Sequence, residues 1–67
     1  MHTAHYEITI RGRLGDTLLG AFAGLTATST PARTVLSGEL PDQAALYGVL
    51  ERIESLGLEL LDVHVTP

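Results

Sequence analysis

The chain has 67 residues, carries a net charge of −4 from eight acidic and four basic residues, and contains no Cys. This length allows one core and no second domain, and so short a chain buries only about 60% of its unfolded surface. The absence of Cys excludes a disulfide scaffold and a thiolate zinc site. An acidic chain with four dispersed Arg residues lacks the basic surface that nucleic acids and anionic membranes require.

The N-terminal residues lack the basic and apolar pattern of a signal peptide. No apolar run in the sequence approaches the roughly 18 residues that a membrane span needs. We therefore expect a cytoplasmic protein, and the thin core predicts that another subunit covers part of its surface.

The first half of the chain predicts a strand followed by a short helix. Residues 5–11 alternate apolar and polar side chains, which is the pattern of a strand with one buried face. A turn containing two glycines follows, and Asp16 is placed to cap a helix over residues 16–23. Gly24 is expected to end that helix.

The second half predicts a hairpin, a longer helix and a final strand. β-branched residues over 25–30 and 33–39, separated by a proline, predict two antiparallel strands. Residues 41–56 carry apolar side chains at helical spacing. Asp42 is either the cap of this helix, which we favour, or a contact to a ligand or partner. Residues 58–65 alternate again and predict a fourth strand.

The order strand, helix, strand, strand, helix, strand predicts a single α+β domain over residues 1–67. With right-handed crossovers, this order closes most simply as a ferredoxin-like sandwich. Its four strands form an antiparallel sheet in the order 4-1-3-2, with both helices on one face. The other face of the sheet, which we call the open face, is left without helices.

Several short motifs along this predicted fold resemble those of one protein family. The most specific is the run Leu-x-Gly-x-x-x-Asp-Gln-Ala-Ala-Leu from Leu36 to Leu46. The others are Arg11-Gly12, Phe22, Gly24-Leu25-Thr26 and Leu56-Gly57-Leu58.

Together, from about Tyr6 to Val63, these motifs resemble a family of short, stand-alone, uncharacterised bacterial proteins. The resemblance supports the fold and implies no catalytic residue and no cofactor. The topology also resembles that of the ACT domains, which sense small molecules, although this likeness concerns the fold alone.

The turn after the first strand is a candidate anion site. Gly12, Arg13 and Gly15 lie between a strand and a helix, where free N–H groups and a guanidinium could hold a phosphate. The ordinary interpretation is that glycines simply allow a tight turn, since the spacing matches no nucleotide-binding motif.

Two histidines on neighbouring predicted strands form a candidate metal site. His5 and His64, with Asp62 close by, would supply two imidazoles and one carboxylate. The ordinary interpretation, which we favour, is a solvated surface or a pH-dependent interface.

The open face is the most suggestive surface for association. We expect a homodimer in which Val35 and Leu60 lie at the centre of the contact. Glu7, Arg11 and Asp62 would set its register. The helices are an alternative surface, because Gly48 permits close approach of a partner and Tyr47 could anchor one.

Three functions stay open on the sequence alone. The leading hypothesis is a non-enzymatic interaction or regulatory module, a homodimer that also binds another protein. The alternative is a small-molecule sensor resembling ACT domains, with its ligand at a subunit interface near the Gly12–Gly15 turn and the second helix. The third is an enzyme whose active site is completed by dimerisation around His5 and His64.

Overall fold

The computed structural model describes residues 4–22 and 24–66. It contains four strands, two α-helices and a short 3-10 helix. In chain order these are β1 (Ala4–Arg11), α1 (Asp16–Leu19), η1 (Gly20–Phe22), β2 (Thr26–Ser29), β3 (Arg33–Leu40), α2 (Gln43–Ser55) and β4 (Leu60–Thr66).

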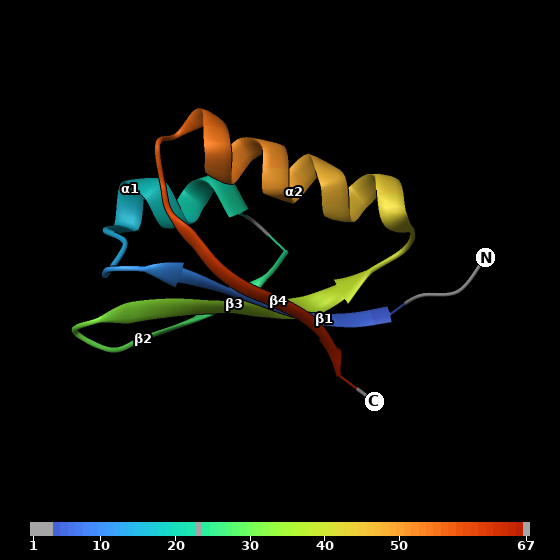
Figure 1. The fold of residues 1–67 in the computed structure, drawn as a ribbon, viewed down its shortest axis with the longest axis horizontal. Helices are drawn as coiled ribbons and strands as arrows, with labels where there is room; N and C mark the ends of the chain where they lie inside the picture. The colour runs from blue at the N-terminus through green and yellow to red at the C-terminus, as the bar shows by residue number, and fades with distance from the viewer. Residues whose placement is uncertain (1–3, 23, 67) are drawn as a thin grey trace.

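The four strands form one antiparallel, open sheet in the order β2-β3-β1-β4. Read from the β4 edge, this is the order 4-1-3-2. Both helices lie on the same side of the sheet, and no described helix lies on the other side (Figure 1). The structure is therefore of the α+β class, with β1 at the centre and with β2 and β4 as the two edges.

The core lies between the sheet and the helices. Ile8 and Ile10 of β1 are completely buried, and Ile8 lies directly opposite Leu36 of β3. Phe22 of η1 and Ile53 of α2 close the core from above. Burying a side chain of this size contributes about 1.5–3 kcal/mol, so these few residues dominate the stability of the fold.

Thr34 ties the turn after β1 to β3. Its side chain is fully buried, and its hydroxyl donates to the carbonyl oxygen of Gly12 at 2.9 Å and accepts from the N–H of Leu14 at 3.2 Å. Gly12 also donates its own N–H to Ala32 at 2.8 Å and has φ of 86°, which a glycine adopts without strain. The turn is thus held by bonds within the fold.

The second helix, predicted over residues 41–56, runs over Gln43–Ser55 and is capped as predicted. Asp42 is the N-cap residue, and its carboxylate accepts from the N–H of Ala45 at 2.8 Å. Gly57 follows the helix with φ of 74°, the left-handed conformation typical of a helix end. The structural role of Asp42 is therefore capping.

The first helix is shorter than predicted. Instead of one helix over residues 16–23, α1 makes a single α-helical turn and continues as η1; residue 23 lies outside the described residues. The prediction that Asp16 caps this helix is wrong, because Gly15 is the N-cap residue and no side chain caps it. Gly20 is a poor helix former, and at this point the chain tightens into the 3-10 form.

A β-bulge shifts the alternation of β4. Thr9 pairs with Asp62, but Ile10 pairs with Leu60, so that Leu61 is an extra residue. Directly opposite residues share a face, and Ile10 faces the core. The prediction that Leu60 lies at the centre of the open face is therefore wrong, because simple alternation does not count the extra residue.

No helix among residues 4–22 and 24–66 is both long enough and apolar enough to span a membrane.

The Thr34 contacts generate the first prediction. Thr34→Val keeps the shape of the side chain but leaves the N–H of Leu14 and the carbonyl of Gly12 without their partner, so we expect a loss of about 1–3 kcal/mol in the free energy of unfolding. Thr34→Ser, the matched control, keeps the hydroxyl and should lose only about 0.8 kcal/mol for the missing methyl group. Urea denaturation followed by circular dichroism measures both; a Val variant as stable as the Ser variant would contradict the role of the hydroxyl.

Candidate functional site

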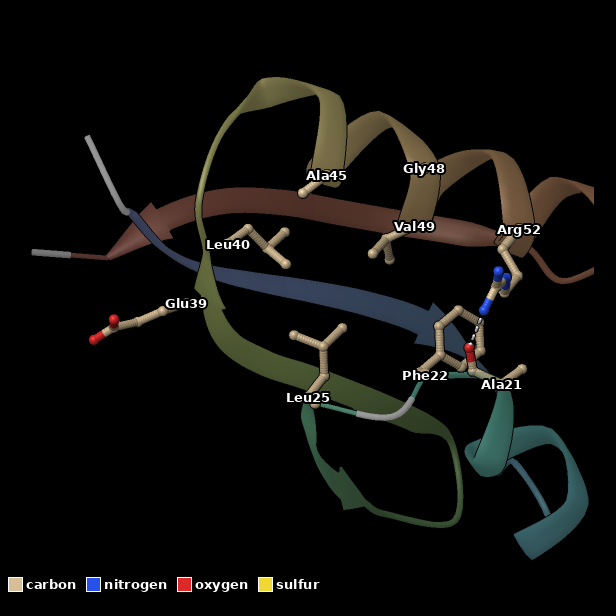
Figure 2. A pocket seen from close by; sticks show the side chains of 10 residues that line it. Ala21, Phe22, Leu25, Glu39, Leu40, Ala45, Gly48, Val49 and Arg52 are labelled. Atoms are coloured by element: carbon tan, nitrogen blue, oxygen red, sulfur yellow. Dashed lines mark hydrogen bonds between the residues drawn. The ribbon is translucent and has the colours of Figure 1, made fainter. Parts of the chain in front are cut away.

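An apolar groove of about 330 Å³ lies between α2 and the segment that joins η1 to β2 (Figure 2). Phe22, Leu25, Leu40 and Val49 point into it from four different elements or connections. On the α2 side the groove is bordered by two small residues, Ala45 and Gly48. The groove is thus a hollow with apolar walls, wide enough for a small ligand or a single inserted side chain.

Two glycines account for the shape of the groove. A Cβ added to Gly48 would meet no atom within 4 Å, so the space beside this turn of α2 is empty. A Cβ added to Gly38 would lie 2.8 Å from Cδ2 of Leu25, so a larger residue at this position of β3 would require the Leu25 side chain to shift. Gly48 therefore borders free space, and Gly38 lets Leu25 pack closely against β3.

A guanidinium stands at one end of the groove. Nη1 of Arg52 donates to the carbonyl oxygen of Ala21 at 2.7 Å and so joins α2 to η1. Arg carries five N–H donors, so this contact leaves others for an anionic group. The carboxylate of Glu39 points away from the groove (Figure 2). The described lining therefore suits an apolar group that ends in a carboxylate.

A second polar cluster lies on the open face. His64 of β4 has Nδ1 2.7 Å from the Asp62 carboxylate and Nε2 3.1 Å from the Glu7 carboxylate. Glu7 is the cross-strand neighbour of His64 on β1. The hydrogen bond to Asp62, followed by the negative charges of Asp62 and Glu7, raises the pKa of His64 above its ordinary value.

The predicted open-face interface is only partly assembled. Glu7 and Asp62 are brought together, with His64 between them. Arg11 instead pairs with Glu59 at 3.0 Å, and both side chains are exposed. Val35 is half-buried and lies opposite Thr9, which is only 9% exposed, so the middle of the open face is already filled by its own side chains.

The structure places the two candidate metal ligands diagonally across β1 and β4 and not directly opposite each other. His5 pairs with Thr66, and no group of three or more His, Cys, Asp or Glu in residues 4–22 and 24–66 could hold a metal ion. Both ring nitrogens of His64 face carboxylates. Both nitrogens of this ring are therefore already in contact with side chains of the same chain.

The candidate anion site is a structural turn. The N–H groups of Gly12 and Leu14 already donate to Ala32 and Thr34. Gly15 precedes a helix of only four residues. The ordinary interpretation of Gly12, Arg13 and Gly15 therefore accounts for what the structure shows.

Sequence reasoning did not find the groove. Its walls come from residues far apart in the chain, and each of them also reads as a core position. The available signal was the pair of small residues, Ala45 and Gly48, on one side of a helix that is otherwise apolar at helical spacing.

The His64 cluster predicts a measurable titration. Asp62→Asn should lower the pKa of His64 more than Glu7→Gln does, because the hydrogen bond to Asp62 is the largest cause of the shift. Titration of the His64 ring followed by NMR measures both values. A larger fall of the His64 pKa in Glu7→Gln would contradict the assignment of Asp62 as the main cause of the shift.

The same shift fixes the sign of a pH effect on stability. The pKa of His64 is higher in the folded chain than in the unfolded one. The protonated ring therefore contributes fully to the free energy of unfolding below about pH 6.5, and this contribution is lost as the pH rises through the pKa of the folded state. The pH dependence should shrink in Asp62→Asn.

Comparison with known proteins gives a family and no activity. Searches among curated proteins and among solved structures found no match. A family model described as a domain of unknown function, DUF8691, matches residues 5–64. This range includes the described groove lining and the whole Glu7, Asp62 and His64 cluster. The chain therefore belongs to the DUF8691 family.

Proposed function

We propose that this chain is a small, non-enzymatic interaction or regulatory module that forms a homodimer and binds another protein. The observation that carries the proposal is the apolar surface that the fold leaves uncovered. Leu60, Leu61 and Val65 of β4 are 41%, 40% and 58% exposed, and Tyr47 of α2 is 59% exposed. In a chain of 7.1 kDa, such a concentration of exposed apolar side chains on one strand is typical of a contact surface.

The polar groups support an interaction role over catalysis. General acid–base catalysis uses a carboxylate or histidine in a cleft that shifts its pKa. His64, whose pKa is raised, is exposed on a flat sheet face, and its carboxylate neighbours account for the shift. The described lining of the groove carries charge only at Glu39 and Arg52.

The wider setting of the proposal rests on the sequence. We propose a ferredoxin-like class, which the strand order and the placement of both helices support. A bacterial origin and the Leu36–Leu46 motif as a family signature stay predictions. A cytoplasmic location is compatible with a chain that contains no Cys.

The groove favours a second candidate function, that of a small-molecule binder similar to ACT domains. Its walls are apolar, and Arg52 offers N–H donors at one end. Such a site would hold a small monocarboxylate with an apolar body. The sequence predicted this ligand at a subunit interface near the Gly12–Gly15 turn and the second helix. The groove lies along that helix, α2, and its described lining includes no residue of the turn.

The homodimer is tested by the mass of the native chain in solution. Size-exclusion chromatography with light scattering should give twice 7.1 kDa, with dissociation on dilution. Val65→Asp should shift the protein toward the monomer, because it places a charge in the exposed apolar surface of β4. A native chain that is monomeric at every concentration would contradict the homodimer.

The second candidate is tested at Gly48. Phenylacetate and hexanoate should raise the melting temperature of the native chain by mass action. Gly48→Leu, which fills the groove, should abolish this shift. Gly48→Ala, the matched control, adds one methyl group and should be about 1 kcal/mol more stable while keeping the response. Equal responses in all three proteins, or no response in the native chain, would remove the groove as a ligand site.

A further inference from the structure

The outer edge of β4 offers unpaired backbone groups for another strand. β4 is the last strand in the order β2-β3-β1-β4, and among residues 4–22 and 24–66 it pairs with β1 alone. It runs for seven residues, Leu60–Thr66. The opposite edge, β2, has only four residues, all small and polar or Ala. β4 is therefore the edge that presents the longer row of free N–H and C=O groups.

The sequence of β4 does little to prevent such pairing. Natural edge strands are usually protected by Lys, Pro or bulges. Leu60–Thr66 contains no Lys, Arg or Pro, and its bulge lies at the start of the strand, beside Leu61. From Asp62 onward the strand is regular, and Val65 is 58% exposed.

We propose that β4 pairs antiparallel with β4 of a second copy of this chain, around a twofold axis at Val63. The inference rests on the homodimer proposed above and names its contact surface. The two four-stranded sheets would then join into one continuous sheet. Such an isologous contact closes on itself and yields a dimer.

The chemistry of β4 selects this register. Val63 is the middle residue of the strand, so an axis there pairs its full length. Asp62 then lies opposite the partner's His64 at two places, and each pair joins opposite charges when the imidazole is protonated. Leu61 lies opposite the partner's Val65, which covers apolar side chains that are exposed in the single chain.

Two neighbouring registers also place the helix-covered faces of the two sheets on the same side, and both are less favourable. An axis at Asp62 places this carboxylate against the partner's Asp62, and an axis at His64 places two histidines against each other. Like charges directly opposite each other destabilise a strand pair. Of the three axes, the one at Val63 pairs Asp62 with His64, brings Leu61 against Val65 and pairs the full length of the strand.

Pairing at β4 leaves the groove free. The described residues that line the groove belong to η1, the connection before β2, β3 and α2, and none lies on β1 or β4. In the sheet, β1 separates β4 from β3. A dimer formed through β4 therefore keeps two identical grooves open for another partner or ligand.

Disulfide trapping tests the register directly, because the chain contains no Cys of its own. Residues on a twofold axis of an antiparallel pair have Cα atoms about 4.5–5.5 Å apart. A disulfide spans about 4.4–6.8 Å. Val63→Cys should therefore form a covalent dimer quickly under mild oxidation of the folded protein. Thr28→Cys on the exposed opposite edge is the matched control and should cross-link much more slowly.

The outcomes separate this inference from the proposed function. A dimeric native mass with fast cross-linking at residue 63 supports both. A dimeric native mass in which Val63→Cys cross-links no faster than Thr28→Cys overturns pairing at β4 and leaves the homodimer standing. A monomeric native mass overturns both.

A charge-exchange pair gives a second test that does not alter Val63. Asp62→Lys sets Lys against the partner's His64, and His64→Glu sets Glu against the partner's Asp62, so each variant alone should dimerise more weakly than the native chain. Mixed together, the two should form a heterodimer in which both contacts join opposite charges. Folding of each variant is checked by circular dichroism, and a mixture no more dimeric than its components would contradict the register.

Discussion

The pairing of β1 on both of its sides is the constraint on which the structure depends. β1 is hydrogen-bonded to β3 and to β4, and its Ile8 and Ile10 are completely buried. Three other elements cover these two side chains: β3 supplies Leu36 beside them, and η1 and α2 close the core with Phe22 and Ile53. A chain of 67 residues has material for one such layer of cover and no more.

The surfaces available for function follow from that limited cover. At one edge of the sheet, β4 keeps Leu61 and Val65 exposed. On the other side, α2 and Leu25 stand apart and leave the groove, since Ala45 and Gly48 are too small to fill it. The two surfaces lie on opposite sides of the core. A β4 contact and a bound partner in the groove are therefore compatible in one assembly.

Local patterns predicted most of the fold and little of the candidate site. Alternation and helical spacing predicted four strands and two helices, and the identity of Asp42 predicted a cap that the structure confirms. The error at Leu60 arose because a bulge depends on how β4 meets β1. The error at Asp16 arose because Gly15 takes the N-cap position, so Asp16 is the first residue of the helix itself. The groove was not predicted because its walls come from residues that are far apart in the sequence and meet only in the folded chain.

The sequence by itself determined the class of the elements, the net charge of −4 and the absence of thiol chemistry, since these depend on residue type and on periods of a few residues. Only the tertiary structure decided that His64 lies between Glu7 and Asp62, that Thr34 holds the Gly12 turn, and that β4 is an uncovered edge. These features depend on strand order and register, which join residues far apart in the chain. A one-residue shift in register changes the face on which a side chain lies, and local patterns do not specify such a shift.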